Sequence, residues 1–485
     1  MKQFNERNLS MVMDLYEMTM ANGYFKDQDN DKRVAFDVFY RKNPDQGGFA
    51  IFAGLQQIIE YIENLHFGKE DISYLRSLNL FDEDFLECLA NFKFRGDVYA
   101  FPEGTIMYPN EPILTVVAPL LDAQLVETAI LLQVNHQSLV ATKARRIVKA
   151  AAGRVVTDFG ARRAHNMDAA VYGARAAYIG GAVGTATVIA GQMFDIPVSG
   201  TMAHSWIMFY KDEFEAFKKY AETYPDSTTL LIDTYDVLNS GVPNAIRCAK
   251  EVLEPMGKRL KGVRIDSGEL ALLSKEVRRM LDEAGLKDCK IVVSNSLDEY
   301  TISSILKEGG CIDFFGVGER LITAKSDPVF GAVYKIAAVE ENGEFVPRIK
   351  VSENVEKITN PGLKKVYRVY DKNGKAVADL LAKADEKLDF SKPFRYVDEK
   401  KYWKVRHFEN CIAKELQLPI FKNGKCVYPN VSMKEIREYV ERQLSNEIWE
   451  EEQRFENPHT HYVSMTPALY EMKMSLLDES RVEER

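Results

Sequence analysis

The middle of the chain repeats one unit, in which a short apolar, β-branched run ends in polar or glycine residues and an amphipathic helix follows. Most runs are about 30 residues apart, the length of a βαβ unit. Continuous apolar strands that alternate with helices predict a parallel sheet covered on both faces. The runs are Arg154–Asp158, Gly181–Gly184, Pro197–His204, Thr229–Asp233, Lys261–Asp266, Lys290–Asn295 and Ile312–Val317.

The ends of these runs decide between a barrel and an open sheet. Nearly every run ends in polar, charged or glycine residues that could bind a ligand or take part in catalysis. The sequences at these ends are DFG, GT, AHS, DTYD, RIDSG, SNS and GVGE. A (β/α) barrel places such groups around its C-terminal mouth, whereas a doubly wound sheet concentrates them at one or two switch points. Seven units instead of eight predict an irregular α/β barrel, which we assign to residues 126–331.

The flanks have a different pattern. Residues 32–41 alternate in polarity, prolines break short strands between 95 and 119, and two Asn-Gly turns in 332–382 predict hairpins. We therefore expect a smaller β-rich α+β domain built from residues 1–125 and 332–400. Residues 401–485 are expected to be mostly helical, because Ser432 and Glu435 form a capping box before a helix-like pattern.

Charge and cysteine content limit the partners and the compartment. The 485 residues include 72 acidic and 63 basic ones, and a net charge of −9 argues against non-specific binding to nucleic acid or to an anionic membrane. Six cysteines without a C-x-x-C pair indicate reduced thiols. The start, MKQFNERNLS, lacks a signal-peptide core, and the uncharged run from Arg175 to Asp195 contains several glycines. These features predict a soluble, cytoplasmic protein.

Two motifs carry groups suited to catalysis. His204, in GTMAHS, follows a predicted strand, where an imidazole can serve as acid, base or phosphoryl acceptor, although a structural histidine fits as well. In RIDSG, Arg264 suits a carboxylate or phosphate, and Asp266 precedes a possible helix N-terminus. A buried Arg–Asp pair with a helix cap explains the same residues.

Two further motifs suit a planar, phosphorylated ligand. In DFGARR, Phe159 and Arg162 place a ring and a guanidinium on one loop, and in GVGE, Gly316 and Gly318 let the backbone approach a phosphate. A core phenylalanine with solvated arginines, and a tight turn, are the alternatives. Asp233 offers oxygens for Mg²⁺ or a sugar, or belongs to a turn. The residues alone thus indicate a barrel enzyme for a phosphorylated anionic metabolite.

Taken in order, the motifs resemble the nicotinate phosphoribosyltransferase family. The resemblance rests on DLYEMTMANGYF, FDVFYRKNP, FPEGTIMYPNEPIL, DFGARRAH, GTMAHS, LLIDTYD, GVRIDSGEL, VVSNSLDE and DFFGVGERL. It implies an irregular barrel of the type II phosphoribosyltransferase kind. It also implies that nicotinate and phosphoribosyl pyrophosphate (PRPP) give nicotinate mononucleotide and pyrophosphate, coupled to ATP hydrolysis. The resemblance implies Mg²⁺, bound together with PRPP and ATP, as the cofactor, and no bound organic cofactor. It does not assign the protein ligands of Mg²⁺.

The resemblance also implies roles for individual residues. His204 matches the histidine that ATP transiently phosphorylates, and Asp266 matches the ligand of a ribose hydroxyl. Phe159 matches one face of a clamp on the pyridine, and Tyr16 the other face, supplied by a second subunit of a homodimer whose active sites lie at the interface. The remaining matches are nicotinate contacts and a 5′-phosphate cradle, namely Arg264 and Thr201 for nicotinate, and Arg162, Gly316 and Gly318 for the phosphate.

Two positions separate this chain from relatives. Glu319 stands where animal relatives carry a small hydroxyl residue, which changes the phosphate contact expected there. Ala186 stands where nicotinamide phosphoribosyltransferases carry an aspartate, and its lack of charge favours the acid substrate over the amide. The competing hypotheses are a nicotinamide-specific enzyme, an inactive member that senses NAD metabolites, and a phosphate-binding barrel lyase or isomerase.

Overall fold

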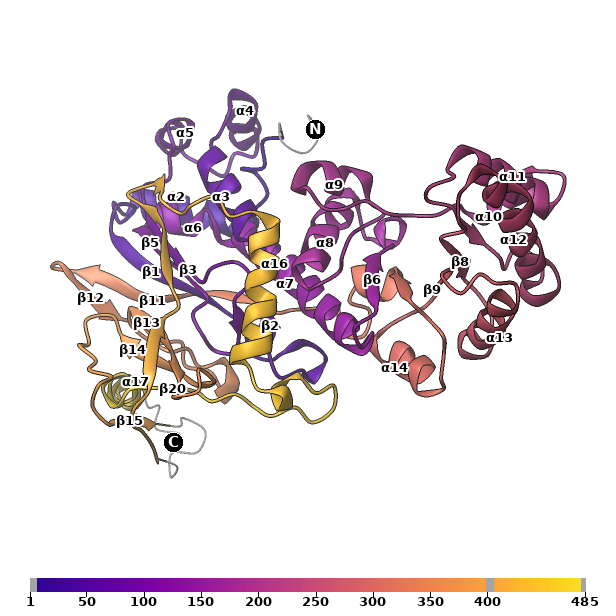
Figure 1. Cartoon of the computed structure of the whole chain (residues 1–485). Coiled ribbons are helices and arrows are strands. Elements are labelled where there is room, and N and C mark those ends of the chain that lie inside the picture. Colours follow the sequence, from indigo (N-terminus) through magenta and orange to yellow (C-terminus); the bar gives the residue numbers. More distant parts are fainter. Residues whose placement is uncertain (1–6, 398–404, 481–485) are drawn as a thin grey trace. The chain divides into compact units, whose positions relative to one another are not determined.

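The computed structural model describes residues 7–397 and 405–480, which form two compact units (Figure 1). We call Val140–Pro328 the central unit, and the residues up to Leu139 together with those from Val329 onward the flanking unit. The predicted limit between residues 400 and 401 lies outside the described residues. In the described part of the chain, no helix is both long and apolar enough to cross a membrane.

The central unit is built on a parallel sheet. Its strands, in spatial order, are β6 (Val155–Asp158), β10 (Phe314–Val317), β9 (Lys290–Ser294), β8 (Gly262–Ile265) and β7 (Thr229–Leu231). Single parallel bridges extend the β6 edge from Asp158 to Thr185 and from Thr185 to Val198. The seven predicted runs all lie in or beside these parallel positions. These seven successive parallel positions, with no pairing among the described residues between Val198 and β7, agree with the expected irregular barrel.

Helices connect these strands. In α13 (Leu270–Glu283), the apolar residues Leu270, Val277 and Leu281 recur at helical spacing and are buried in the core. The other helices of this unit are α8 (Met167–Ile179), α9 (Val188–Phe194), α10 (His204–Phe209), α11 (Glu213–Thr223), α12 (Val242–Cys248), α14 (Glu299–Lys307) and α15 (Glu319–Ile322).

The flanking unit joins both ends of the chain in one antiparallel sheet, as predicted. Its order is β12 (Glu344–Pro347), β11 (Val333–Glu341), β1 (Arg33–Phe39), β5 (Leu114–Pro119), β3 (Asp97–Ala100), β18 (Leu418–Lys422) and β19 (Lys425–Cys426). Asn342 and Gly343 both have positive φ and close the β11–β12 hairpin, since such turns match the strand twist.

A second sheet of the flanking unit corrects the prediction of a mostly helical segment over 401–485. Its order is β16 (Val405–Phe408), β15 (Phe394–Val397), β20 (Val463–Met465), β14 (Ala376–Lys383), β13 (Lys364–Tyr370) and β17 (Ile412–Glu415). The segment supplies β16, β17 and β20 to this sheet and β18 and β19 to the first sheet, besides α16 (Met433–Arg442) and α17 (Pro467–Glu479). Strands this short depend on their sheet partners, which local sequence does not reveal. The capping box at Ser432 and Glu435 is present.

The remaining elements of the flanking unit lie mostly in its first part. They are α2 (Leu15–Lys26), α3 (Leu55–Asn64), α4 (Lys69–Ser77), α5 (Glu83–Ala90), α6 (Leu120–Gln124), and the small pair β2 (Ala50–Ile51) and β4 (Ile106–Met107). Helix α7 (Glu127–Ala150) begins in the flanking unit and ends in the central one.

Charged side chains form a network in the core of the flanking unit. Arg368 on β13 donates to Asp379 on β14 at 2.6 Å, and both side chains are buried. The ring of His461 lies 3.4 Å from Asp379 and 3.3 Å from Glu452. Burial alone lowers the pKa of His461, but the two carboxylates outweigh burial and raise it above its ordinary value.

Candidate active site

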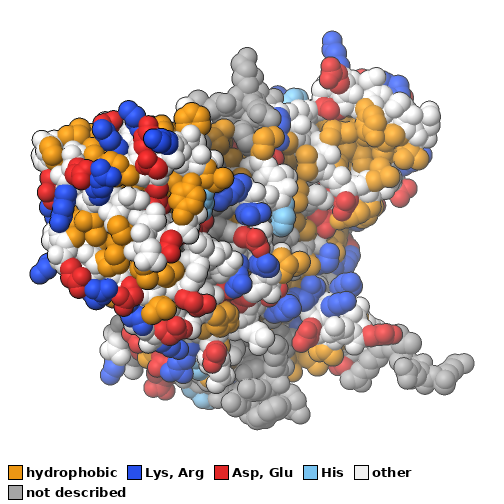
Figure 2. Space-filling view, turned by 90° about the vertical axis from the view of Figure 1, so that its right-hand side faces the viewer, with side chains coloured by type: hydrophobic (Ala, Val, Ile, Leu, Met, Phe, Trp, Pro, Cys, Tyr) orange, Lys and Arg blue, Asp and Glu red, His pale blue; other side chains and the backbone are white. Residues whose placement is uncertain are grey.

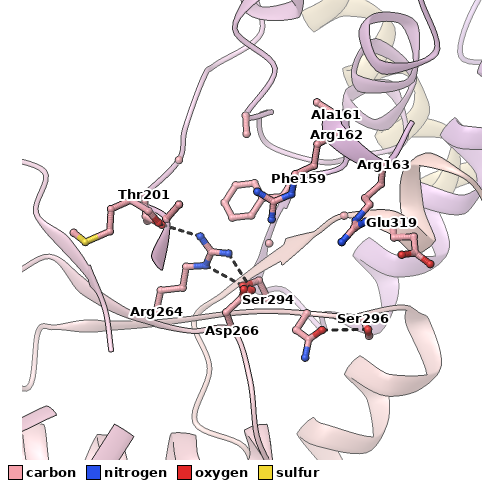
Figure 3. Close-up of a pocket in the computed structure, with 17 residues that line it drawn as sticks. Phe159, Ala161, Arg162, Arg163, Thr201, Arg264, Asp266, Ser294, Ser296 and Glu319 are labelled. Atoms are coloured by element: carbon pink, nitrogen blue, oxygen red, sulfur yellow. Dashed lines mark hydrogen bonds and ion pairs between the residues drawn. The ribbon is translucent and has the colours of Figure 1, made fainter. Parts of the chain in front are cut away.

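A pocket of about 400 Å³ lies at the carboxyl ends of the parallel strands (Figure 3). Its walls come from the ends of β6, β8, β9 and β10 and from the loop before α10, as expected for the mouth of a barrel. The structure thereby brings together most of the predicted site residues, namely Phe159, Arg162, Thr201, Arg264, Asp266, Gly316 and Gly318.

The ring of Phe159 forms an aromatic wall, and a glycine on β10 makes room for it. The Phe159 backbone N–H donates to the carbonyl of Val317 at 2.8 Å, which anchors the residue beside β10. A Cβ on Gly316 would lie 2.4 Å from the Cδ2 and Cε2 atoms of this ring, closer than any van der Waals contact. Gly316 is therefore required by the ring itself, independently of any phosphate.

A buried carboxylate holds the turn that carries this ring. Asp158 accepts hydrogen bonds from the Gly160 N–H at 2.8 Å and from the Thr185 hydroxyl at 2.7 Å. Burial raises the pKa of Asp158. Its carbonyl accepts from the N–H of Ala186 at 2.8 Å, which fixes Ala186 in the pocket wall. Sequence reasoning missed this role, because only the fold brings Thr185 beside Asp158.

Arg264 is the best-anchored cation of the pocket. Its Nε donates to the Ser294 hydroxyl at 2.9 Å, its Nη1 to the Thr201 hydroxyl at 3.0 Å, and its Nη2 to the Asp266 carboxylate at 3.0 Å (Figure 3). The guanidinium carbon lies 5.4 Å from the centroid of the Phe159 ring. A fixed guanidinium beside an aromatic ring suits a planar ligand that carries a carboxylate.

Asp233 links His204 to this pocket. One carboxylate oxygen lies 3.2 Å from Nε2 of His204, and the other accepts from the Asp266 N–H at 2.9 Å and from the Ser267 hydroxyl at 2.6 Å. The His204 side chain is 40% exposed, whereas that of Asp233 is 1% exposed. His204 begins α10 and does not line the pocket, but one side chain separates it from Asp266. The sequence had offered Asp233 only as a metal or sugar ligand, or as part of a turn.

The part of the pocket lined by Arg162, Arg163 and Glu319 carries mixed charge. Arg162 and Arg163 lie in the short helical turn Ala161–Arg163 after Phe159 and are exposed. Glu319 forms an ion pair with Lys325 at 2.7 Å, and this hydrogen-bonded lysine holds the pKa of Glu319 below its ordinary value. Glu319 therefore stays ionised in neutral solution and reduces the net positive charge that faces an anionic ligand.

Tyr16 belongs to the flanking unit, on α2, where its side chain is 44% exposed. Burial of its hydroxyl, followed in importance by the charge of Glu127, raises the pKa of Tyr16. Among the described residues, no group of three or more His, Cys, Asp or Glu side chains is arranged to hold a metal ion. All six cysteines are unpaired.

Comparison with known proteins places this geometry in context. Residues 155–373 match the nicotinate phosphoribosyltransferase (NAPRTase) family, and residues 11–135 and 363–473 match its N-terminal and C-terminal domains. A nicotinate phosphoribosyltransferase of Bacillus subtilis is 46% identical, over 99% of this chain and 98% of the relative. The Homo sapiens relative of the same name is 30% identical, over 96% of both chains.

Solved structures agree with the sequence comparison. The crystal structure of human nicotinic acid phosphoribosyltransferase superposes with a TM-score of 0.85 at 28% identity, and covers 96% of this chain and 99% of its own. A nicotinate-nucleotide pyrophosphorylase from Pyrococcus furiosus superposes with a TM-score of 0.68 at 27% identity, and covers 90% and 96%.

Proposed function

Because the chain belongs to the nicotinate phosphoribosyltransferase family, we propose that its pocket joins nicotinate to PRPP, the first step of NAD synthesis from nicotinic acid. One observation carries the proposal, namely the Arg264 guanidinium held by three hydrogen bonds beside the Phe159 ring. The ring would contact the pyridine of nicotinate, and Arg264 and Thr201 would bind its carboxylate.

The uncharged wall at Ala186 supports the acid as substrate. A carboxylate at this position would repel nicotinate and accept a hydrogen bond from the amide of nicotinamide. Ala186 lines the pocket and offers only a methyl group and its backbone. We therefore place nicotinate ahead of nicotinamide as the substrate.

The transfer forms a bond between the pyridine nitrogen and C1′ of the ribose, and breaks the bond between C1′ and the pyrophosphate oxygen. Positive charge develops on the sugar, so positioning and electrostatics supply most of the rate enhancement. Asp266 would hold a ribose hydroxyl, and Arg162 with the backbone at Gly316 and Gly318 would hold the 5′-phosphate.

Mg²⁺ would bind in this pocket as a complex with the phosphate groups of PRPP. The described residues contain no cluster of carboxylates that would hold the ion alone. Mg²⁺ is usually bound by one or two carboxylates together with substrate phosphates, and it would neutralise charge on the pyrophosphate group.

ATP would act through His204. Asp233 faces Nε2 of this ring at 3.2 Å, and a proton on Nε2 leaves the Nδ1 lone pair as nucleophile. Nδ1 would attack the γ-phosphorus and release ADP. Water later breaks the resulting P–N bond and releases phosphate, so that ATP and water give ADP and phosphate. The negative charge added near the pocket would favour binding of Mg²⁺ and PRPP.

A homodimer completes the proposed site. Tyr16 is exposed on α2, and its neighbours Leu15 and Met20 are exposed apolar residues, which fits a surface that a second copy covers.

Acidic and basic side chains are interspersed on the face shown in Figure 2, without the continuous basic surface that nucleic acid requires. The six unpaired cysteines support a cytoplasmic location.

Product analysis tests the reaction. The protein is incubated with PRPP, Mg²⁺ and ATP, and with nicotinate, nicotinamide or quinolinate in parallel. We expect nicotinate mononucleotide and pyrophosphate from nicotinate. Preferred conversion of nicotinamide would move the chain to the amide-specific enzymes, and absence of PRPP consumption would favour the sensor or the lyase and isomerase hypotheses.

Labelling with γ-phosphate-labelled ATP tests the role of His204. We expect a label that is labile in acid and stable in alkali on the wild type, and none on His204→Ala. His66→Ala is the matched control, because His66 belongs to the flanking unit, where Nδ1 of its ring lies 2.7 Å from the carbonyl oxygen of Asn64. An unlabelled wild type, or equal labelling of His204→Ala, would refute the phosphohistidine.

A further inference from the structure

Ser294 stands between two strands of the site in a position that sequence reasoning did not single out. It ends β9, which lies between β8 and β10. In the parallel register, Ile265 pairs with Val293, so Ser294 comes level with Asp266, and on the other side Ser294 pairs with Gly316. The side chain is almost fully buried and lines the pocket.

The direction of each hydrogen bond at this hydroxyl follows from its partners. A guanidinium only donates, so the Ser294 oxygen accepts from Nε of Arg264 at 2.9 Å. A carboxylate only accepts, so the Ser294 hydroxyl gives its proton to Oδ1 of Asp266. Nη2 of Arg264 donates to the same Oδ1 at 3.0 Å. These three bonds close a ring that joins the proposed nicotinate and ribose contacts.

This ring determines which donors remain for a ligand. A guanidinium has five N–H groups, and three of those on Arg264 donate to Ser294, Thr201 and Asp266. Among the described contacts, one N–H on each Nη atom is left for the substrate carboxylate. Without the Ser294 hydroxyl, the Nε proton would lose its acceptor in a side chain that is only 12% exposed. The guanidinium would then turn toward another partner.

We propose that Ser294 is a positioning residue that sets the plane in which Arg264 meets the carboxylate of the substrate. The inference rests on the proposed function, because it assumes a pyridine carboxylic acid in the pocket. A positioning role for Ser294 differs from a purely structural role in one measurable respect. Loss of the Ser294 hydroxyl should weaken substrate binding far more than it slows the chemical step.

The test compares two serine-to-alanine variants. We expect Ser294→Ala to raise the KM for nicotinate about tenfold while kcat stays within about threefold of wild type. Ser294→Thr keeps the hydroxyl and should therefore have a KM close to that of wild type. Ser274→Ala is the matched control. The buried Ser274 hydroxyl on α13 donates to the Ala271 carbonyl and accepts from the Cys311 N–H, outside the pocket, so its loss should leave KM unchanged.

The result that overturns the inference is an active Ser294→Ala with unchanged KM, a fall in kcat at constant KM, or an equal KM shift in Ser274→Ala. Circular dichroism and urea unfolding are measured on every variant. If Ser294→Ala does not fold, Ser294→Cys replaces it, because a thiol is a weak acceptor and the same KM shift is expected. A failure of the proposed function shows separately, as absence of product from the wild type.

Discussion

Replacing Gly316 with alanine should push the aromatic wall out of place. The added Cβ would lie 2.4 Å from two ring carbons of Phe159 and 3.3 Å from a third. Ordinary carbon contacts are about 3.5–4.0 Å, so the ring or β10 must shift by about 1 Å. Overpacking of this kind costs about 1–3 kcal/mol in the free energy of unfolding.

The same shift should reach the substrate. An aromatic contact contributes about 0.5–1.5 kcal/mol beyond its buried area, so displacing the Phe159 ring should raise the KM for nicotinate by about two- to twelvefold. Steady-state kinetics with saturating PRPP measure this change, and urea unfolding measures the loss of stability.

A double-mutant cycle isolates the cause. Gly316→Ala should destabilise the Phe159→Leu variant much less than the wild type, since the smaller side chain vacates the contact. Gly23→Ala on α2 is the control for stability, because no atom lies within 4 Å of the Cβ that it adds. Equal destabilisation of both backgrounds by Gly316→Ala, or an unchanged KM, would refute the reasoning.

Three further variants test the pocket wall and the buried charges. Ala186→Asp should raise the KM for nicotinate at least about tenfold through like-charge repulsion, and unchanged nicotinate kinetics would contradict this. Arg368→Met should lower the free energy of unfolding in urea by about 3–5 kcal/mol, because the buried Asp379 loses its guanidinium partner, whereas a loss below about 1 kcal/mol would argue against this. The pKa of His461 is raised above its ordinary 6.5, so its contribution to stability is complete below that pH and is lost as pH rises through the higher folded value. The stability difference between wild type and His461→Gln should therefore shrink as the pH of urea titrations rises above 6.5, and a constant difference would contradict the assignment.

The barrel was predictable because its signal is local. Each strand is a short apolar run, such as the one that ends at Asp158, and its length and composition are legible without knowledge of its neighbours. The polar residues at the ends of the runs, Arg264 and Asp266 among them, then marked the mouth. The order of the strands in space, β6-β10-β9-β8-β7, was not predictable from the individual runs. It depends on how the right-handed connections place each strand in the assembled sheet.

The contacts that arrange the site could not be predicted in the same way. Ser294 meets Arg264 and Asp266 because of the register between β8 and β9, which no single segment encodes. The requirement for Gly316 arises from the ring of Phe159, more than 150 residues earlier in the chain. The strands after residue 401 were missed for a related reason, since β17, β18 and β20 pair with strands in distant segments.

The interleaved sheet of the flanking unit has a consequence for how the protein is made. Strand β3 (Asp97–Ala100) leaves the ribosome about 300 residues before β18 (Leu418–Lys422), the strand that covers its edge. Every strand of the central unit, in contrast, lies between Val155 and Val317, so that unit can complete its sheet while the edge of β3 is still open. An open edge pairs readily with other chains, so the growing polypeptide is most prone to aggregate during the interval in which its central unit is already formed.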